Sequence, residues 1–254
     1  MHDLSNNSAI EPPLRVDEHE VHVWEVDLDA PDAWPCCLDE TERQRAQRFR
    51  FERDRRRWVA AHTALRRILS RYVGMGPDRL QFLTTEHGKP YLPAECAGRG
   101  IRFNLSHSGA LALIAVARAE VGVDIEDTTR VIDWPALCPD MFSAREAQGL
   151  SDGHGKAALP PWAIWTLKEA YLKGRGCGLT LPLRAFEIMP DPNGHTFRIA
   201  IEAKRDDGLD WRLVSLDAPV GYAAGLAVTR CLARVRRFAW TGNSRLDDLS
   251  RGYA

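Results

Sequence analysis

The stretch VGVDIE, residues 121–126, alternates apolar and acidic side chains from Val123 onward, which predicts a β-strand. On a strand, the side chains of Asp124 and Glu126 point to the same face. Two carboxylates held this close repel each other unless a positive group lies between them. A hard divalent cation such as Mg²⁺ is the usual solution, so the stretch predicts a pair of metal ligands.

A second charged pair lies in WTLKEAYLK, residues 165–173, where Glu169 and Lys173 are one helical turn apart. Such pairs are most often exposed salt bridges worth about 0.3–0.5 kcal/mol. The flanking tryptophans and leucines predict instead that part of this helix is buried. Glu169 can supply a third carboxylate and Lys173 a point charge for a phosphate. The chain is therefore predicted to hold a metal and a phosphorylated ligand together.

The segment FNLSHSG, residues 103–109, places Ser106 and His107 just after an apolar strand, in a predicted turn. Backbone N–H groups, the hydroxyl and the imidazole can all donate hydrogen bonds to a phosphate. Taken alone, the segment is more typical of an ordinary turn with an exposed histidine. The absence of a Gly-x-Ser-x-Gly pattern argues against a serine hydrolase.

Basic residues concentrate between positions 43 and 71, where 11 arginines are opposed only by Glu52 and Asp54. Arg53 and Arg57 share one face of a predicted helix and could grip a phosphate bidentately, although an arginine run is usually a solvated face. Lys89 lies in a Gly-Lys-Pro turn. The formal net charge of -1 argues against a nucleic-acid-binding protein.

Composition indicates a globular protein of one large unit or two lobes, since 44% of the 254 residues are hydrophobic. No apolar run approaches the roughly 20 residues that span a bilayer, and the N-terminus lacks a signal peptide. The six cysteines contain no Cys-x-x-Cys pair, which favours a cytoplasmic location.

Each half of the chain is expected to mix short strands with one or two helices, which places the fold in the α+β class. Capping boxes at Asp39-x-x-Glu42 and Ser143-x-x-Glu146 predict two helix starts. The expected divisions are a flexible N-terminal tail (1–14), an N-terminal lobe (15–122), a C-terminal lobe (123–237) and a C-terminal tail (238–254).

Four segments, in this order and spacing, resemble the 4′-phosphopantetheinyl transferases, in particular the larger type that activates surfactin synthetase. They are Gly88-Lys89-Pro90, FNLSHSG, GVDIE and WTLKEAYLKGRGCGL, and the resemblance covers residues 39–179. It implies a pseudo-dimer of two similar α+β lobes with coenzyme A in the cleft between them. It also implies transfer of phosphopantetheine from coenzyme A to a serine of an apo acyl, peptidyl or aryl carrier protein, with release of adenosine 3′,5′-bisphosphate.

The resemblance also implies roles for individual residues. Glu169 and Lys173 would be catalytic, Glu169 as the base that activates the carrier serine, directly or through a metal-bound water. The helix geometry, rather than the resemblance, adds Arg57 to the coenzyme site. The expected ligands of Mg²⁺ are Asp124, Glu126 and Glu169, and the expected contacts to coenzyme A are Arg53, Lys89, Asn104, Ser106, His107, Asp124 and Lys173.

Two other classes fit parts of the pattern. A metal-dependent phosphohydrolase or nuclease could use the same three carboxylates, and a nucleic-acid-binding module could use the arginine-rich stretch. A steep fall of nucleic-acid affinity with salt would favour the latter. The chain is long enough for both lobes, so a monomer with no membrane or nucleic-acid partner is expected.

Overall fold

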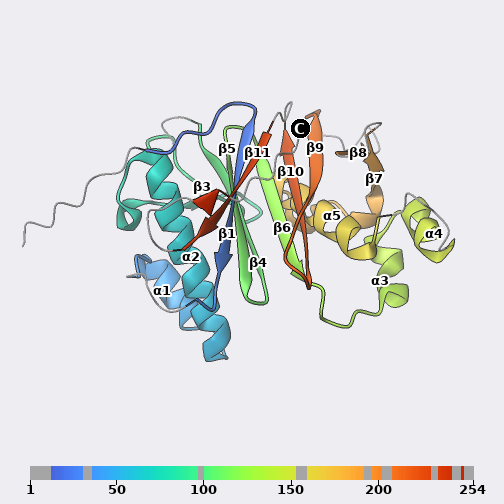
Figure 1. Ribbon diagram of the computed structural model, residues 1–254, viewed down its shortest axis with the longest axis horizontal. Coiled ribbons are helices and arrows are strands. Elements are labelled where there is room, and N and C mark those ends of the chain that lie inside the picture. Colours follow the sequence, from blue (N-terminus) through green and yellow to red (C-terminus); the bar gives the residue numbers. More distant parts are fainter. Residues whose placement is uncertain are drawn as a thin grey trace, which may run out of the picture.

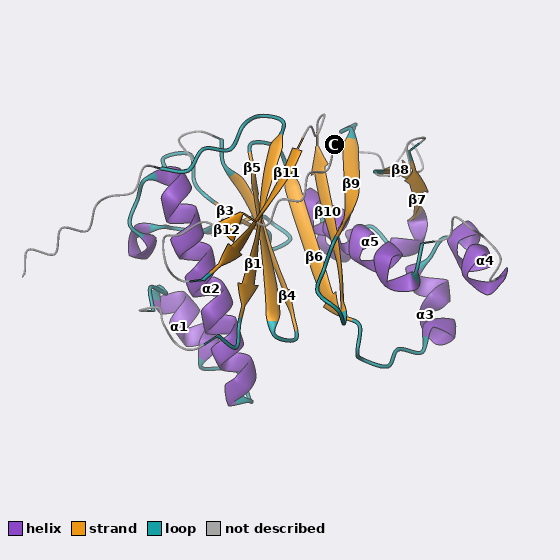
Figure 2. Ribbon diagram, viewed as in Figure 1, coloured by secondary structure: helices purple, strands orange, loops and turns teal. Residues whose placement is uncertain are grey.

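The computed structural model describes residues 13–30, 36–96, 100–152, 159–191, 196–201, 208–229, 234–241 and 247–248. It has four layers, in which two five-stranded sheets lie between two layers of helices (Figures 1 and 2). The apolar inner faces of the sheets pack against each other in one core, and a further core lies between each sheet and its helices. The predicted α+β class with two lobes is confirmed.

The first sheet has the strand order β12-β11-β1-β5-β4. Strand β5, which lies between β1 and β4, is apolar throughout because both of its faces are covered. Ile114 belongs to the core under α2, whereas Leu113 belongs to the core between the sheets. The bounds are β1 Glu20–Asp27, β4 Arg102–Ser108, β5 Leu111–Ala117, β11 Arg234–Trp240 and β12 Asp247–Asp248, with a separate small hairpin of β2 Leu83–Thr84 and β3 Pro90–Tyr91.

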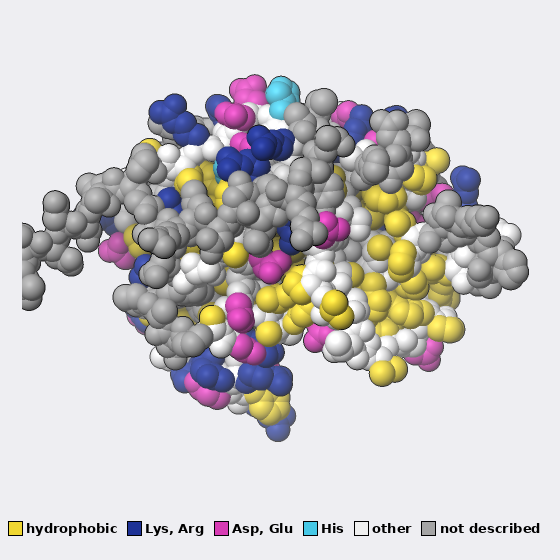
Figure 3. Space-filling view, in the orientation of Figure 1, with side chains coloured by type: hydrophobic (Ala, Val, Ile, Leu, Met, Phe, Trp, Pro, Cys, Tyr) yellow, Lys and Arg dark blue, Asp and Glu magenta, His cyan; other side chains and the backbone are white. Residues whose placement is uncertain are grey.

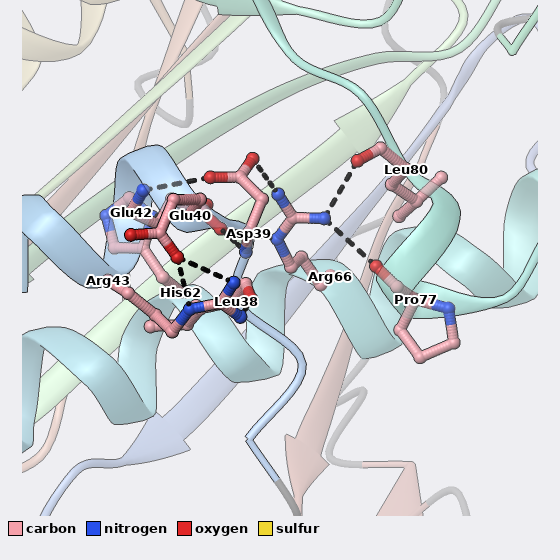
Figure 4. A network of polar contacts seen from close by, with 9 residues as sticks. All are labelled: Leu38, Asp39, Glu40, Glu42, Arg43, His62, Arg66, Pro77 and Leu80. Atoms are coloured by element: carbon pink, nitrogen blue, oxygen red, sulfur yellow. Dashed lines mark hydrogen bonds and ion pairs between the residues drawn. The ribbon is translucent and has the colours of Figure 1, made fainter.

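Helices α1 (Glu40–Ala46) and α2 (Glu52–Val73) cover the outer face of this sheet, followed by a 3-10 turn at Pro77–Arg79. The fully buried Arg66 of α2 holds them in place. Its guanidinium donates to the carboxylates of Glu42 at 2.6 Å and Asp39 at 2.5 Å (Figure 4). It also donates to two backbone carbonyl oxygens of the segment after α2. A buried charge needs this complete set of partners to be tolerated.

The second sheet has the strand order β6-β10-β9-β8-β7. Helix α5 packs on its outer face, and α3 and α4 lie beyond (Figure 1). The predicted capping boxes at Asp39 and Ser143 both form. The bounds are β6 Val121–Asp127, β7 Phe186–Pro190, β8 Phe197–Ile201, β9 Trp211–Leu216, β10 Tyr222–Thr229, α3 Trp134–Met141, α4 Ala144–Asp152 and α5 Pro161–Arg175, with 3-10 turns at Gly178–Thr180 and Leu183–Ala185.

Two glycines allow α5 to lie unusually close to β6. A Cβ atom on Gly122 would lie 2.0 Å from the carbonyl oxygen of Ala170 and 2.3 Å from the backbone nitrogen of Gly174. No side chain fits in that space, so glycine is required at position 122. The close approach brings the polar side chains of α5 to those of β6.

Two expectations from the sequence differ from the structure near the site. Strand β4 continues through Ser108, so Ser106 and His107 lie on a strand and not in a turn. The apolar residues between Leu80 and Thr84 also predict a short strand, but the structure has only the two residues of β2 there, after the 3-10 turn at Pro77–Arg79. Helix α3 was not expected from the sequence.

The expected boundary between the C-terminal lobe and the C-terminal tail, at residue 237, does not coincide with the end of a strand. Strand β11 crosses it and pairs in parallel with β1 of the first sheet. The reason is apolar packing, since Phe238 stacks on Trp24 with ring centroids 4.7 Å apart and Trp240 contacts the same ring. Of the two expected tails, residues 1–12 and most of the stretch after 241 lie outside the described residues.

No helix in the described part of the chain combines the length and the apolar character needed to cross a membrane.

Candidate active site

The centre of the candidate site is a three-residue contact between the lobes. Lys173 of α5 donates to Asp124 Oδ1 of β6 at 2.5 Å and to Ser106 Oγ of β4 at 2.8 Å. Ser106 in turn donates to the same Asp124 oxygen at 2.9 Å. Three residues predicted from separate motifs are thus brought together by the folded chain.

The environment of Asp124 disfavours the charged form of its carboxylate. It is buried, and its second oxygen, Oδ2, has no hydrogen-bond partner among the described residues. Burial, together with the charge of Glu126, raises the pKa of Asp124 to about 6, despite the opposing effect of Lys173. An orphaned, desolvated oxygen in a negative environment is suited to receive a cation.

Glu126 and Glu169 lie around the same point and are both partly buried. Glu126 accepts a hydrogen bond from Ser108 Oγ at 2.8 Å and a longer one from Trp165 Nε1 at 3.4 Å. The pKa of Glu169 is raised, first by burial and also by the charge of Glu126, although Lys173 opposes the shift. Glu126 therefore interacts electrostatically with both Asp124 and Glu169.

A preassembled metal site of three carboxylates is not observed. Among the residues that the structure describes, no group of three or more His, Cys, Asp or Glu side chains has the arrangement of a metal site. Like charges separate when nothing lies between them, and here the ammonium of Lys173 compensates the charge of Asp124. The donor set still fits a hard cation, because these are carboxylate oxygens and Asp124 Oδ2 is unpartnered.

A cavity of about 340 Å³ opens beside these residues. Glu169 and Lys173 form part of its wall, and the remainder comes mainly from the turn that contains Lys89 and from the C-terminal end of α5. Lys89 Nζ donates to the carbonyl oxygen of Gly174 and forms an ion pair with Glu120 at 3.0 Å. Lys89 therefore joins the two lobes at one end of the cavity.

Two further residues of β4, Asn104 and His107, were expected to contact the coenzyme. Asn104 also lines the cavity, but its side chain is buried and its Oδ1 accepts from the backbone N–H of Val123 at 2.9 Å. His107 points the other way and is exposed. Although part of the ring is exposed, partial desolvation lowers the pKa of His107, and electrostatic interactions with His62 and Lys173 lower it further. Because Asn104 Oδ1 already accepts from Val123 N–H, a ligand that donates to this oxygen has to compete with the internal hydrogen bond.

The two arginines expected near a phosphate form ion pairs elsewhere. Arg57 grips Asp29 bidentately, at 2.8 and 2.5 Å, and Arg53 pairs with its neighbour Asp54 at 3.0 Å. Neither is among the described residues that line the cavity. Lys and Arg side chains gather where α2 begins, at the lower end of the first lobe (Figure 3).

Several polar partners in the site were not expected from the sequence. Ser108, Trp165 and Glu120 contact the predicted residues Glu126 and Lys89. A signal was present for Ser108, because polar residues recur at every second position from 104 to 108. That period of two is typical of a strand with one polar face.

Two family models together match most of the chain. One, for the N-terminal part of a 4′-phosphopantetheinyl transferase, matches residues 24–119, and another, for the 4′-phosphopantetheinyl transferase superfamily, matches residues 120–229. The 4′-phosphopantetheinyl transferase HetI of Nostoc sp. strain PCC 7120 is 34% identical over 225 residues, which are 85% of this chain and 91% of HetI. The chain belongs to the 4′-phosphopantetheinyl transferase superfamily. It is an enzyme of the larger type, as the sequence motifs predicted.

One further relative and one solved structure of a phosphopantetheinyl transferase are less similar to this chain than HetI is. The 4′-phosphopantetheinyl transferase Sfp of Bacillus subtilis strain 168 is 28% identical over 154 residues, 60% of this chain and 66% of Sfp. Among solved structures, the holo-[acyl-carrier-protein] synthase of Thermotoga maritima overlaps 44% of this chain and 63% of its own, with a TM-score of 0.36 and 20% identity.

Proposed function

We propose that this transferase moves 4′-phosphopantetheine from coenzyme A to a serine hydroxyl of an apo acyl, peptidyl or aryl carrier protein, with Mg²⁺ as its metal. The leaving group is adenosine 3′,5′-bisphosphate. The observation that carries the proposal is the contact of Asp124, Lys173 and Ser106 where the two lobes meet, with an unpartnered Asp124 Oδ2 and with a cavity that Lys173 and Glu169 line.

Asp124, Glu126 and Glu169 are the residues that would hold the metal. When bound, Mg²⁺ acts as a Lewis acid on the pyrophosphate of coenzyme A and offsets its charge. Support comes from the raised pKa values of Asp124 and Glu169, since a nearby cation stabilises the ionised form of both carboxylates.

Lys173 and Lys89 are the cations that bind the phosphates of coenzyme A in this proposal. The side chain of Lys173 is 31% exposed, so its ammonium is accessible to a ligand while it also touches Asp124. Lys89 lines the same cavity. Phosphoryl-type transfer depends mainly on positioning and on charge stabilisation, which fixed ammonium groups provide. Ser106, His107 and Asn104 are proposed to add hydrogen bonds, and Arg53 and Arg57 to add charge farther from the cavity.

Glu169 is proposed as the base for the carrier serine. It lines the cavity, and its raised pKa brings it closer to the neutral range in which a general base works best. The serine oxygen forms a bond to the β-phosphorus, the bond from that phosphorus to the oxygen of the bisphosphate breaks, and the serine proton passes to Glu169 or to a water held by it.

The test is a transfer assay with defined products. The enzyme is incubated with an apo carrier protein, coenzyme A and Mg²⁺, and the carrier is analysed by mass spectrometry while the released nucleotide is quantified by chromatography. The expected result is one phosphopantetheine arm on serine for each bisphosphate released, and no transfer after chelation of the metal. Nucleotide release without carrier modification would indicate a phosphohydrolase and overturn the proposal.

A further inference from the structure

The two sheets meet along β4 and β6, each of which is the last strand of its own sheet. In the described residues these edge strands are joined by side chains, with no recorded backbone ladder between them. Three polar side chains of β4, at alternate positions, accept hydrogen bonds from three backbone N–H groups of β6, also at alternate positions. We call this set the seam: Asn104 with Val123, Ser106 with Ile125, and Ser108 with Asp127.

The seam satisfies backbone donors that an edge strand otherwise leaves unpaired. The bond lengths are 2.9 Å for Asn104, 3.4 Å for Ser106 and 3.1 Å for Ser108. Each bond spans 19 residues in the sequence, so the three share one register. A shift of that register would break all of them together, and the seam therefore fixes how β6 lies against β4.

The two serines of the seam also act on the carboxylates. A hydroxyl has one donor and two acceptor positions, so it can accept from a backbone N–H and donate to a carboxylate together. Ser106 donates to Asp124 at 2.9 Å, and Ser108 donates to Glu126 at 2.8 Å. Each serine therefore donates to the carboxylate of one residue and accepts from the backbone N–H of the next residue in the chain.

The carboxylate of Glu126 depends more on Ser108 than the carboxylate of Asp124 depends on Ser106. Asp124 has two close donors, Ser106 and Lys173, so the loss of one leaves the other. Among the residues that the structure describes, the other donor to Glu126 is Trp165 Nε1, whose hydrogen bond of 3.4 Å is weak. Ser108 is also buried, so water does not readily take its place.

We propose that Ser108 is a positioning residue that orients the Glu126 carboxylate from the opposite lobe and thereby raises the affinity of the site for its divalent cation. The inference rests on the proposed function, since it assumes that Glu126 serves the metal. Removal of a hydrogen-bonding partner of a metal ligand typically lowers metal affinity about 10- to 100-fold. Ser108→Ala is therefore expected to weaken metal binding about tenfold. Transfer should recover most of its rate at saturating Mg²⁺.

The test measures metal binding directly. Mn²⁺ is titrated into the full-length enzyme with coenzyme A, and free Mn²⁺ is followed by electron paramagnetic resonance. Ser70→Ala is the matched control, because the Ser70 hydroxyl donates to the carbonyl of Arg67 on α2, outside the candidate site. Ser108→Cys is the second variant, because it keeps the size of the side chain and has only a weak donor, which covers the case that Ser108→Ala does not fold. Ser108→Thr keeps the hydroxyl.

The proposal is supported if Ser108→Ala and Ser108→Cys raise the Mn²⁺ dissociation constant about tenfold, while Ser70→Ala and Ser108→Thr stay close to wild type. It is overturned if the folded alanine or cysteine variant binds Mn²⁺ as tightly as wild type, because the serine would then only join the sheets. A wild-type enzyme that neither binds Mn²⁺ nor modifies a carrier would overturn the proposed function itself. A wild-type enzyme that does both, with unchanged affinity in the variants, overturns only the role of Ser108.

Discussion

At the scale of single residues, Asp124 illustrates a conflict between stability and chemistry. Its carboxylate is almost completely buried, and the bonds from Ser106 and Lys173 reach only one of its oxygens. Desolvation raises its pKa to about 6, so the metal-free fold prefers the protonated form more than the unfolded chain does. Because this placement does not favour folding, we expect the Asp124 carboxylate to serve a ligand and not the core.

Replacing the Asp124 carboxylate with an amide separates its effect on transfer from its effect on stability. Asp124→Asn is expected to reduce transfer by about 100-fold or more, because a proposed ligand of the metal that stabilises the transferring phosphate is lost. Without metal at pH 7.5, the same variant is expected to be more stable than wild type, by about 1–3 kcal/mol. The advantage should disappear as the pH falls from about 6 towards 4, where the wild-type carboxyl takes up its proton, since its pKa rises from 3.8 to about 6 on folding.

The measurements are the transfer rate and urea unfolding in the presence of a chelator at a series of pH values. Wild-type activity in the purified variant would remove Asp124 from the site. A variant that is less stable than wild type at pH 7.5 would contradict the argument from burial.

The sequence predicted the charged residues of the site better than their partners. Asp124, Glu126, Glu169 and Lys173 lie at spacings that place them on one face of a strand or helix, a purely local property. The contact of Ser108 with Glu126 joins different sheets, and the attraction of Lys89 to the Gly174 carbonyl joins positions 85 residues apart. Local periodicity contains no information on such partners.

At the scale of elements, helix α5 is held by a buried ion pair that immediately precedes Glu169. The ammonium of Lys168 lies 2.5 Å from a carboxylate oxygen of Glu146 on α4 and donates to the carbonyl oxygens of Leu183 and Phe186, at 2.9 Å each. Burial lowers the pKa of Lys168, and the charge of Glu146 opposes that shift. These partners fix the rotation of α5 and with it the direction of Glu169.

Breaking this pair on one side should be strongly destabilising. Lys168→Met leaves Glu146 buried without its partner and is expected to cost about 3–5 kcal/mol of unfolding free energy. The double variant Lys168→Met, Glu146→Gln should recover part of this loss, because no unpaired buried charge remains. Chemical denaturation of wild type and the two variants tests this. Equal stability of wild type and Lys168→Met would show that the pair does not hold the helix.

Helices were easier to predict than strand pairings. Both capping boxes were recognised from four residues each, and α2 and α5 coincide with the helices predicted around Arg53 and around Glu169. Strand β11 was missed because its partner is β1, more than 200 residues earlier in the chain, and its packing on Trp24 has no local signature.

At the scale of the whole molecule, stability depends on polar groups inside the first lobe as well as on the apolar cores. His22 of β1 bonds to Tyr72 of α2 at 2.7 Å, and Trp24 donates to the same hydroxyl at 2.9 Å. Burial lowers the pKa of His22, although the nearby carboxylate of Glu20 favours the protonated form. The folded molecule therefore prefers a neutral His22.

This preference predicts how the free energy of unfolding changes with pH. Below about 6.5, the ordinary pKa of histidine, the unfolded chain binds a proton that folded His22 resists, so this residue makes stability fall as the pH falls. His22→Gln keeps a hydrogen-bonding group but cannot titrate, and it should flatten the slope between pH 6.5 and 5. The measurement is urea unfolding across this range. An unchanged slope in the variant would show that other groups cause the acid sensitivity.

The four-layer arrangement places the acidic residues of one lobe and the seam serines of the other at a single point. The central claim is that a cation bound there faces the pyrophosphate of coenzyme A. A crystal structure with Mn²⁺ and coenzyme A, with the metal located by its anomalous signal, tests this most directly. The account predicts one Mn²⁺ bound by Asp124 and by an oxygen of the pyrophosphate. Coenzyme A bound in the cavity with its pyrophosphate away from Asp124, or Mn²⁺ bound elsewhere, would contradict it.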